Sequence, residues 1–270
     1  MNKIILDLCG GTGCWSNPWK DAGYEVIVMT YPKYDVCKWR EYPVIVELIK
    51  SNRIYGILAA PPCTMFSIAR NDKTAKLPRD LREGMRLVNA CLEIIHECLY
   101  IQHKLSSPGL KFWALENPYG GYLKRFLGKP SLIFHPYEFG DPYTKKTSLW
   151  GEFKELKKNP VKPRDFEHPT TKGARDFVSC VEHYADLKEI PDGYKELTRY
   201  SNRKIMRSMT PQGFAKAFFK ANKSTTLSLK KPKEEKIDDF EAIFAASEDQ
   251  RRKEESAGNL NSAKGDEDGS

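Results

Sequence analysis

The sequence predicts a doubly wound α/β fold, in which helices cover both faces of a mostly parallel sheet. Short apolar runs alternate with stretches of helical periodicity through the first half of the chain. The first apolar run enters a glycine-rich turn, and reactive or polar residues follow two later runs. Such alternation is typical of βαβ units. We expect the carboxyl ends of the strands to meet at the edge where open α/β sheets bind ligands.

The first elements each have a local pattern of their own. The apolar run KIILDLC (3–9) predicts a strand that enters the turn GGTG. A short helix should follow over 16–22, because Gly23 suits its C-terminal end. Residues 24–30 alternate like a strand and end at the turn-like YPKYD, and 43–52 have a helical pattern.

Prolines and long periodicity mark the elements that follow. An apolar strand at 54–60 stops at Pro61 and Pro62. Apolar residues at helical spacing then predict a long amphipathic helix over 79–105. Further strands are expected at 111–115, 132–139 and 146–150.

The second half of the chain divides by composition. After about residue 153 the periodicity weakens among Pro, Lys and acidic residues, which predicts a small loop-rich insertion. Periodicity returns at 210–221, with Thr210 as N-cap and Pro211 at the first helical position. The charged end of the chain is poor in apolar residues and is expected to be disordered. The expected parts are a sheet domain (1–153), the insertion (154–199), a helix completing the sheet domain (200–223) and the tail (224–270).

Composition excludes several classes of protein. No apolar run approaches the roughly 20 residues that cross a membrane, and the N-terminus lacks a secretory signal, so we expect a soluble, cytoplasmic monomer. The seven cysteines form no CxxC pair, which argues against a disulfide framework and a zinc ribbon. His168, Cys180 and His183 are spaced too loosely to predict a metal site. The net charge of +8 fits a polyanionic partner.

The segment LDLCGGTG (6–13) is the first candidate ligand-binding motif. It places a strand ending at Asp7 before a glycine turn and a helix N-terminus, which suits a carboxylate or phosphate. The spacing is not GxGxxG, and residue 30 is Thr where a dinucleotide site would have an acidic residue. This disfavours NAD and suits the shorter turn of S-adenosylmethionine enzymes. A purely structural glycine turn is the alternative.

Two further motifs place reactive side chains after strands. In AAPPCTMFS, Cys63 follows two prolines that fix the loop. In WALENPYGG, a strand ends at Glu116. If these strands lie in one parallel sheet with the strand of Asp7, all three side chains face the same edge. The alternatives are a buried structural cysteine and a capping or surface glutamate.

A fourth motif, FGDPYTKKTSLWG (139–151), places two cations between aromatic residues. Lys145 and Lys146 suit contacts to phosphates or bases. An ordinary edge strand protected by lysines is the alternative.

Taken together, these segments resemble the cytosine-specific (C5) DNA methyltransferase family, in particular its compact bacteriophage-type members. LDLCGGTGCWS resembles the family's cofactor loop, APPCTMFS its PCQxFS nucleophile loop and LENP its ENV motif. FGDPYTKKTSLW resembles the segment that holds QxRxR, and SMTPQGFAKAFF the closing helix. The five segments occur in the family's order, within 4–151 and 199–222.

The resemblance implies a Rossmann-like sheet and methyl transfer from S-adenosyl-L-methionine to carbon 5 of cytosine in DNA. Cys63 would form the covalent adduct with a flipped base. Glu116 would hold ring nitrogen 3 and the exocyclic amine, Asn117 would shape the loop, and Lys145 or Lys146 would contact the cytosine oxygen. The setting would be a bacterial or phage-infected cell, as in restriction–modification.

The resemblance also implies a cofactor site. Its members would be Asp7, Cys9, Gly10, Gly11, Gly13, Trp15, Tyr31, Asp35, Pro61 and Ser208. The chain departs from the family at two places: Thr30 replaces an acidic residue that binds the ribose, and Lys145 and Thr147 replace the two arginines of QxRxR. The short insertion at 154–199 implies short or relaxed sequence specificity in DNA.

Three alternatives stay open from the sequence. The same chemistry on RNA or on a single strand would use the same motifs. A non-catalytic nucleic-acid-binding protein on this scaffold would explain the two departures. A nicotinamide dehydrogenase is disfavoured by the glycine spacing.

Overall fold

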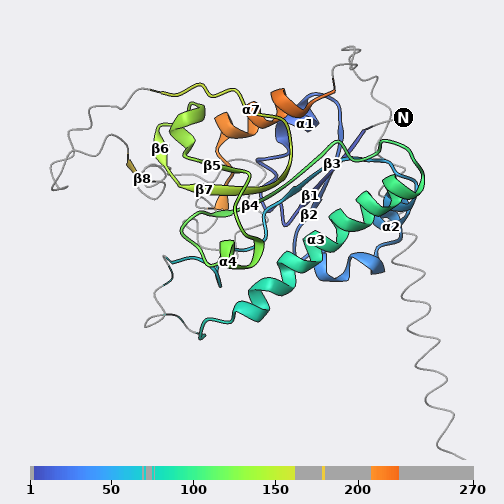
Figure 1. The fold of residues 1–270 in the computed structure, drawn as a ribbon, viewed down its shortest axis with the longest axis horizontal. Helices are drawn as coiled ribbons and strands as arrows, with labels where there is room; N and C mark the ends of the chain where they lie inside the picture. Colours follow the sequence, from blue (N-terminus) through green and yellow to red (C-terminus); the bar gives the residue numbers. More distant parts are fainter. Residues whose placement is uncertain are drawn as a thin grey trace, which may run out of the picture.

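A six-stranded sheet with helices on both faces forms the centre of the structure (Figure 1). The computed structural model describes residues 3–68, 70, 75, 77–161, 178–179 and 208–224. The strands are β1 (Ile4–Leu8), β2 (Glu25–Met29), β3 (Ile54–Ala59), β4 (Phe112–Pro118), β5 (Leu132–Phe134) and β7 (Thr147–Glu152), with a separate pair, β6 (Tyr143–Thr144) and β8 (Val178–Ser179). The helices are α1 (Asn17–Asp21), α2 (Pro43–Lys50), α3 (Leu81–Lys104), α4 (Lys124–Leu127) and α7 (Gln212–Asn222), with 3-10 helices η1 (Val36–Glu41) and η2 (Pro136–Phe139).

The order of the strands creates a switch point beside β1. The sheet runs β2-β1-β3-β4-β7-β5, and the first four strands are parallel. The chain leaves β1 for β2 on one side and later returns to β3 on the other. In open α/β sheets ligands bind outside the carboxyl ends of the strands at such a point. β7 is antiparallel to both neighbours, so it begins at the edge where β4 ends.

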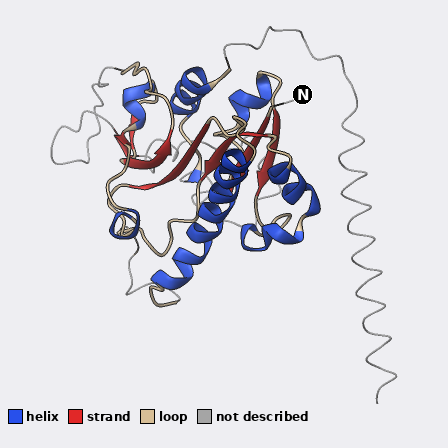
Figure 2. Ribbon diagram, turned by 45° about the vertical axis from the view of Figure 1, so that its right-hand side comes forward, coloured by secondary structure: helices blue, strands red, loops and turns tan. Residues whose placement is uncertain are grey.

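Alternate residues of the central strands pack into two separate cores, and helices lie on the two sides of the sheet (Figure 2). Ile4, Leu6 and Leu8 face α2, α3 and η1, whereas Ile5 faces α1 and α7. This alternation follows from the two-residue period of a strand, and both faces are apolar because both are covered. The expected α/β class, with a mostly parallel sheet, is confirmed.

Helix α7 joins the core of the sheet although it is distant in sequence. It lies beside α1 (Figure 1), where Phe214 stacks on Phe134 with ring centroids 4.2 Å apart. Phe218 meets Phe112 edge-on at 5.6 Å. A Cβ on Gly213 would lie 2.1 Å from the carbonyl oxygen of Phe139, so only glycine allows α7 to approach η2 this closely.

The expected cap of this helix is wrong by one residue and in its chemistry. Pro211, not Thr210, occupies the N-cap position, and no N-cap side chain bonds the first turn. Asp141, distant in sequence, takes that role, since its Oδ2 accepts a hydrogen bond from the Gly213 amide at 2.8 Å. A carboxylate there also opposes the positive end of the helix dipole favourably.

Other boundaries differ for physical reasons. The strand expected at 132–139 stops at Phe134, and η2 follows with Pro136, which has no amide hydrogen for a ladder, at its start. β4 continues past 115 to Pro118 because β7 pairs along its whole end. Of the expected insertion at 154–199, residues 154–161 form no helix or strand, and most of the rest lies outside the described residues, as does the tail from residue 225.

None of the described helices combines the length and the apolar character needed to cross a bilayer.

Phe218→Ala should lower the free energy of unfolding by about 3–5 kcal/mol, because it empties a fully buried position between α7 and the sheet. Urea unfolding measures the change. Lys220→Ala, on the exposed side of the same helix, should change stability by less than about 0.5 kcal/mol. Equal effects of the two substitutions would contradict the packing of α7 on the sheet.

Candidate functional site

Four chain segments meet at the carboxyl edge of the parallel strands. The loops after β1, β3 and β4 lie side by side because these strands are neighbours in register. The Ala60 amide donates to the Leu8 carbonyl at 2.9 Å, which joins the first two loops directly. Thr147 opens β7 opposite Pro118, so the segment with Lys145 arrives at the same edge. The sequence-predicted motifs are therefore brought together.

The glycine loop after β1 has backbone conformations that only glycine adopts without strain. Gly11 and Gly13 have φ of 55° and 68°, in the left-handed region. The Gly13 amide donates to the Gly10 carbonyl at 2.9 Å and closes the turn. Cys9 also has a positive φ, 55°, and its thiol contacts Cys91 of α3, so it presents backbone rather than side chain to the edge.

Asp7 supports this loop from below. It lies inside β1, which ends one residue later than expected, and it is fully buried. A Cβ on Gly10 would lie 2.4 Å from the Asp7 carboxyl carbon, so the backbone of Gly10 rests directly on the carboxyl group. The Ser16 hydroxyl donates to Oδ2 at 2.5 Å, whereas Oδ1 has no hydrogen-bond partner among the described residues. Burial raises the pKa of Asp7 to about 7, against the lowering effect of Ser16.

The loop that carries Cys63 is held from both sides. The Asn117 side-chain amide donates to the Pro61 carbonyl at 3.0 Å inside the protein. The Cys63 carbonyl accepts from the amides of Phe66 and Ser67 at 2.9 and 2.8 Å, which makes a turn.

The far end of that turn is fixed on α3 and on the segment before it. The buried ring of Phe66 packs where Gly84 of α3 has no side chain, since a Cβ there would lie 2.9 Å from the ring. Arg79 donates to the carbonyls of Met65 and Ser67 at 2.8 and 3.2 Å. Cys63 itself stays partly exposed, so the loop presents a thiol from a rigid support.

Glu116 in β4 and Lys145 just before β7 bring two opposite charges to the same edge. Burial raises the pKa of Glu116 above its ordinary value, and the positive charge of Lys145 opposes that shift. The Lys145 ammonium donates to the Met209 carbonyl at 3.3 Å, which brings the segment with Ser208 to the same edge. Thr147 is buried and its hydroxyl donates to the Lys145 carbonyl at 2.8 Å, so that hydroxyl is engaged within the protein.

One residue expected at the cofactor site, Trp15, points into the core instead. Trp15 is only 2% exposed and packs against Phe214 and Phe218, with ring centroids 5.8 and 5.5 Å away. Its ring therefore belongs to the core between α1 and α7. Tyr31 is 61% exposed at the end of β2.

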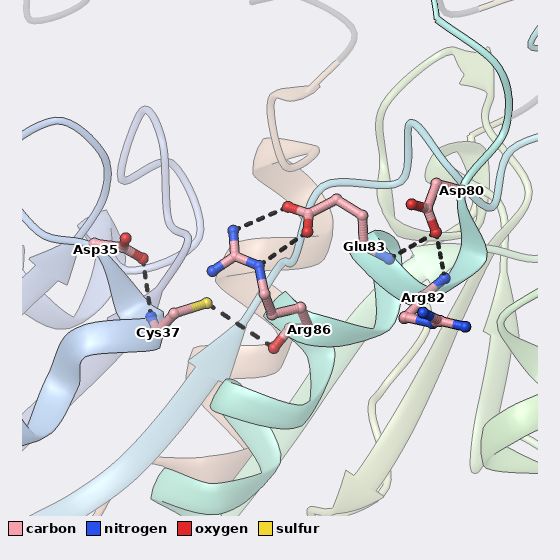
Figure 3. A network of polar contacts seen from close by, with 6 residues as sticks. All are labelled: Asp35, Cys37, Asp80, Arg82, Glu83 and Arg86. Carbon is pink, nitrogen blue, oxygen red and sulfur yellow. Dashed lines mark hydrogen bonds and ion pairs between the residues drawn. The ribbon is translucent and has the colours of Figure 1, made fainter.

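Asp35 begins η1 and is used there as a cap. Figure 3 shows its carboxylate turned to the backbone amide of Cys37, which donates to it at 3.0 Å. The Cys37 thiol in turn lies 3.9 Å from the carbonyl oxygen of Arg86, and Arg86 pairs with Glu83 within the first turns of α3. Asp35 thus caps η1, whose contact with α3 is made by Cys37, and its second carboxylate oxygen is the part that could meet a ligand.

The expected motifs do not include a cation–aromatic surface that follows β4. Tyr119 has the ammonium groups of Lys124 and Lys146 at 5.0 and 4.1 Å from its ring centroid. Tyr122 has the guanidinium groups of Arg79 and Arg125 at 4.9 and 4.8 Å from its ring centroid. The interleaving of Tyr, Lys and Arg in YGGYLKR was the available signal. Such a surface suits phosphates and unstacked bases.

The described residues hold no group of three or more His, Cys, Asp or Glu side chains that could bind a metal ion. His168, Cys180 and His183 lie outside the described part of the chain.

Asp7→Asn should remove a pH dependence of stability. The unfolded carboxyl releases its proton near pH 4, but the folded one keeps it until about pH 7, so the parent's free energy of unfolding falls as pH rises through this window. The difference between parent and variant should change by up to about 1.4 kcal/mol per pH unit there and level off above it. Denaturant unfolding across the window measures it, and a constant difference would contradict a protonated buried Asp7.

Comparison with known proteins gives this edge no assignment: no protein-family model matches the chain, and neither does any curated protein.

Proposed function

We propose that this chain transfers a methyl group from S-adenosyl-L-methionine to carbon 5 of cytosine in DNA, with Cys63 as the nucleophile. The observation that carries the proposal is the joining of the Cys63 loop to the Glu116 strand by the buried Asn117–Pro61 hydrogen bond, beside the glycine loop. A thiol, a carboxyl group of raised pKa and a glycine-lined turn then share one edge of the sheet. Perturbed carboxyl groups gather at functional sites more often than elsewhere.

The glycine loop fits the proposed cofactor in two respects. Its backbone at Gly10, Gly11 and Gly13 leaves no side chain between a ligand and the main chain. The buried Oδ1 of Asp7 lacks a partner, as expected of a group that orients a ligand-binding loop. Pro61, Tyr31, Asp35 and Ser208 would complete the surroundings. S-adenosyl-L-methionine, when bound, supplies the electrophilic methyl group.

The residues of the chain account for the remaining chemistry. The Cys63 thiolate adds to carbon 6 of the ring, and the displaced electron pair moves toward ring nitrogen 3. Glu116 gives its proton to that nitrogen, a role that its raised pKa favours. Carbon 5 is now nucleophilic and takes the methyl group. A base then removes the proton of carbon 5, the bond to Cys63 breaks, and the proton on nitrogen 3 returns to Glu116.

Lys145 and Asn117 act on the geometry of this step. Lys145 places a positive charge near Glu116 while it is fixed to the Met209 carbonyl, and it is the cation available to the cytosine oxygen. Asn117 is a positioning residue, because it touches the loop and not the ring. Lys lacks the bidentate donor fork of Arg, so Lys145 would give the cytosine oxygen a single hydrogen bond.

A nucleic-acid substrate is supported by charge as well as by chemistry. The net charge is +8, and the cation–aromatic surface lies directly after the strand that carries Glu116. Phosphates would meet the cations, and a base taken out of its stack could rest on the aromatic rings. The same surface suits duplex DNA, a single strand and RNA.

Cys63→Ala should abolish methyl transfer and leave nucleic-acid binding intact, because only the thiol is lost. Transfer of labelled methyl groups to duplex DNA, single-stranded DNA and RNA measures the activity and identifies the polymer. DNA containing 5-fluorocytosine should trap the parent as a cofactor-dependent adduct, which Cys63→Ala cannot form.

The matched control for this experiment is Cys37→Ala, since Cys37 is partly exposed like Cys63 but lies in η1. It should keep activity. Full transfer by Cys63→Ala would refute the nucleophile. Binding without transfer by the parent would favour the non-catalytic alternative.

Glu116→Gln should lower the rate about 10²–10⁴-fold, because an amide cannot deliver a proton. In the parent, activity should fall as pH rises through the raised pKa of Glu116, where the protonated form is lost. The variant should lack this alkaline decline. A pH profile of kcat/KM for both proteins tests the role, and an unchanged decline in the variant would assign it to another group.

A further inference from the structure

A second basic feature lies at the opposite edge of the sheet. A hollow of about 640 Å³ opens where the parallel strands begin. Lys3, Arg53 and Lys111 each come directly before a strand, β1, β3 and β4 respectively, and all three line it. Lys154 and Lys223, which follow β7 and α7, complete its cationic lining.

The lining of this hollow has one sign of charge. Five cations line it, and no Asp or Glu is among the described residues that do so. None of the five forms an ion pair within the described part of the chain. Like charges gathered without counter-charges repel one another, so this arrangement costs stability unless an anion accompanies it.

Neutral groups hold the walls in place between the cations. The Tyr55 hydroxyl donates to the Asn222 carbonyl at 2.9 Å, and the Asn222 side chain accepts from the Lys154 amide at 2.9 Å. Asn52 donates to the Ser107 carbonyl at 2.9 Å on the other side. The framework is therefore fixed by hydrogen bonds, whereas four of the five cationic residues are exposed and Lys3 lies over the Tyr55 ring at 5.1 Å.

We propose that this hollow binds the phosphates of a nucleic-acid strand. The cations come from five separate segments and stand at the rim, and none of the buried unpartnered polar atoms in the described structure belongs to a residue that lines the hollow. That arrangement suits a row of phosphates better than one small anion, which would be held by converging buried donors. The inference takes its class of partner from the proposed function but requires no methyl transfer.

The two edges are separated by the length of the strands, roughly 17–20 Å. A nucleic acid in the hollow therefore contacts the protein far from the base held near Cys63. The hollow adds affinity that depends on phosphates and not on sequence.

The test replaces Arg53 and Lys111 together, as Arg53→Gln/Lys111→Gln in the full chain. Fluorescence anisotropy of a labelled DNA duplex, without cofactor, should show binding about tenfold weaker at low salt. The slope of log affinity against log salt should fall by about 2, one for each lost phosphate contact. The control, Lys38→Gln/Arg40→Gln, removes two cations that already pair with Glu41 and Glu93 and should bind like the parent. Thermal unfolding checks that all three proteins are folded.

Equal affinity and equal salt slope for parent and Arg53→Gln/Lys111→Gln would overturn the inference. So would tight binding of inorganic tripolyphosphate that the double variant loses while its DNA binding is unchanged, because the ligand would then be a small anion. The inference and the proposed function fail separately. If the protein methylates DNA but the hollow does not bind it, only the inference about the hollow is refuted. If the hollow binds DNA but the protein transfers no methyl group, only the proposed function is refuted.

Discussion

The hydrogen bond from Asn117 to the Pro61 carbonyl is the contact on which the candidate site depends most. Pro61 and Pro62 have no amide hydrogen, so the loop after β3 cannot anchor itself by donating at these positions. A donor must come from elsewhere, and the parallel pairing of β3 with β4 brings the buried Asn117 within 3.0 Å. The rigidity that the prolines give to the loop is thereby tied to the strand of Glu116. Sheet register and one side-chain bond together set the thiol and the carboxyl group at one edge.

The loop after β1 combines two features that are unfavourable for stability. Burying a carboxyl group with one unpartnered oxygen costs free energy, and so does a positive φ at Cys9, a residue with a Cβ. The raised pKa of Asp7 reduces the first cost, because the neutral form tolerates burial. Strain and desolvation at one turn, within a sheet that is otherwise well packed, are expected of a turn that serves ligand binding, as the proposed function requires.

How far the sequence predicts this structure depends on the range of the interactions involved. The strands β1, β2 and β3 and the helix α3 follow from periodicity and from breakers within a few residues, and they were predicted with small boundary errors. The cap of α7 could not be predicted in this way, because Asp141 comes about seventy residues before the helix. Trp15 was expected beside a cofactor, yet its ring packs on α7, a contact between segments about two hundred residues apart. The motif residues reached one edge because that outcome needs only parallel strands, whereas side-chain direction needs the whole core.

The net charge can be read from the sequence, but the position of the charges depends on the fold. Composition gives a net charge of +8, which fits a polyanionic partner, but it cannot place the charge. The fold divides it between the cation–aromatic surface after β4 and the hollow where the strands begin. At the first, cations lie over aromatic rings and so can meet a base and its phosphate together. At the second, cations line a hollow without carboxylates, and the Tyr55 ring beneath Lys3 is buried, so this surface suits phosphates more than bases. Under the proposed function, the first surface would meet a base and the second a backbone.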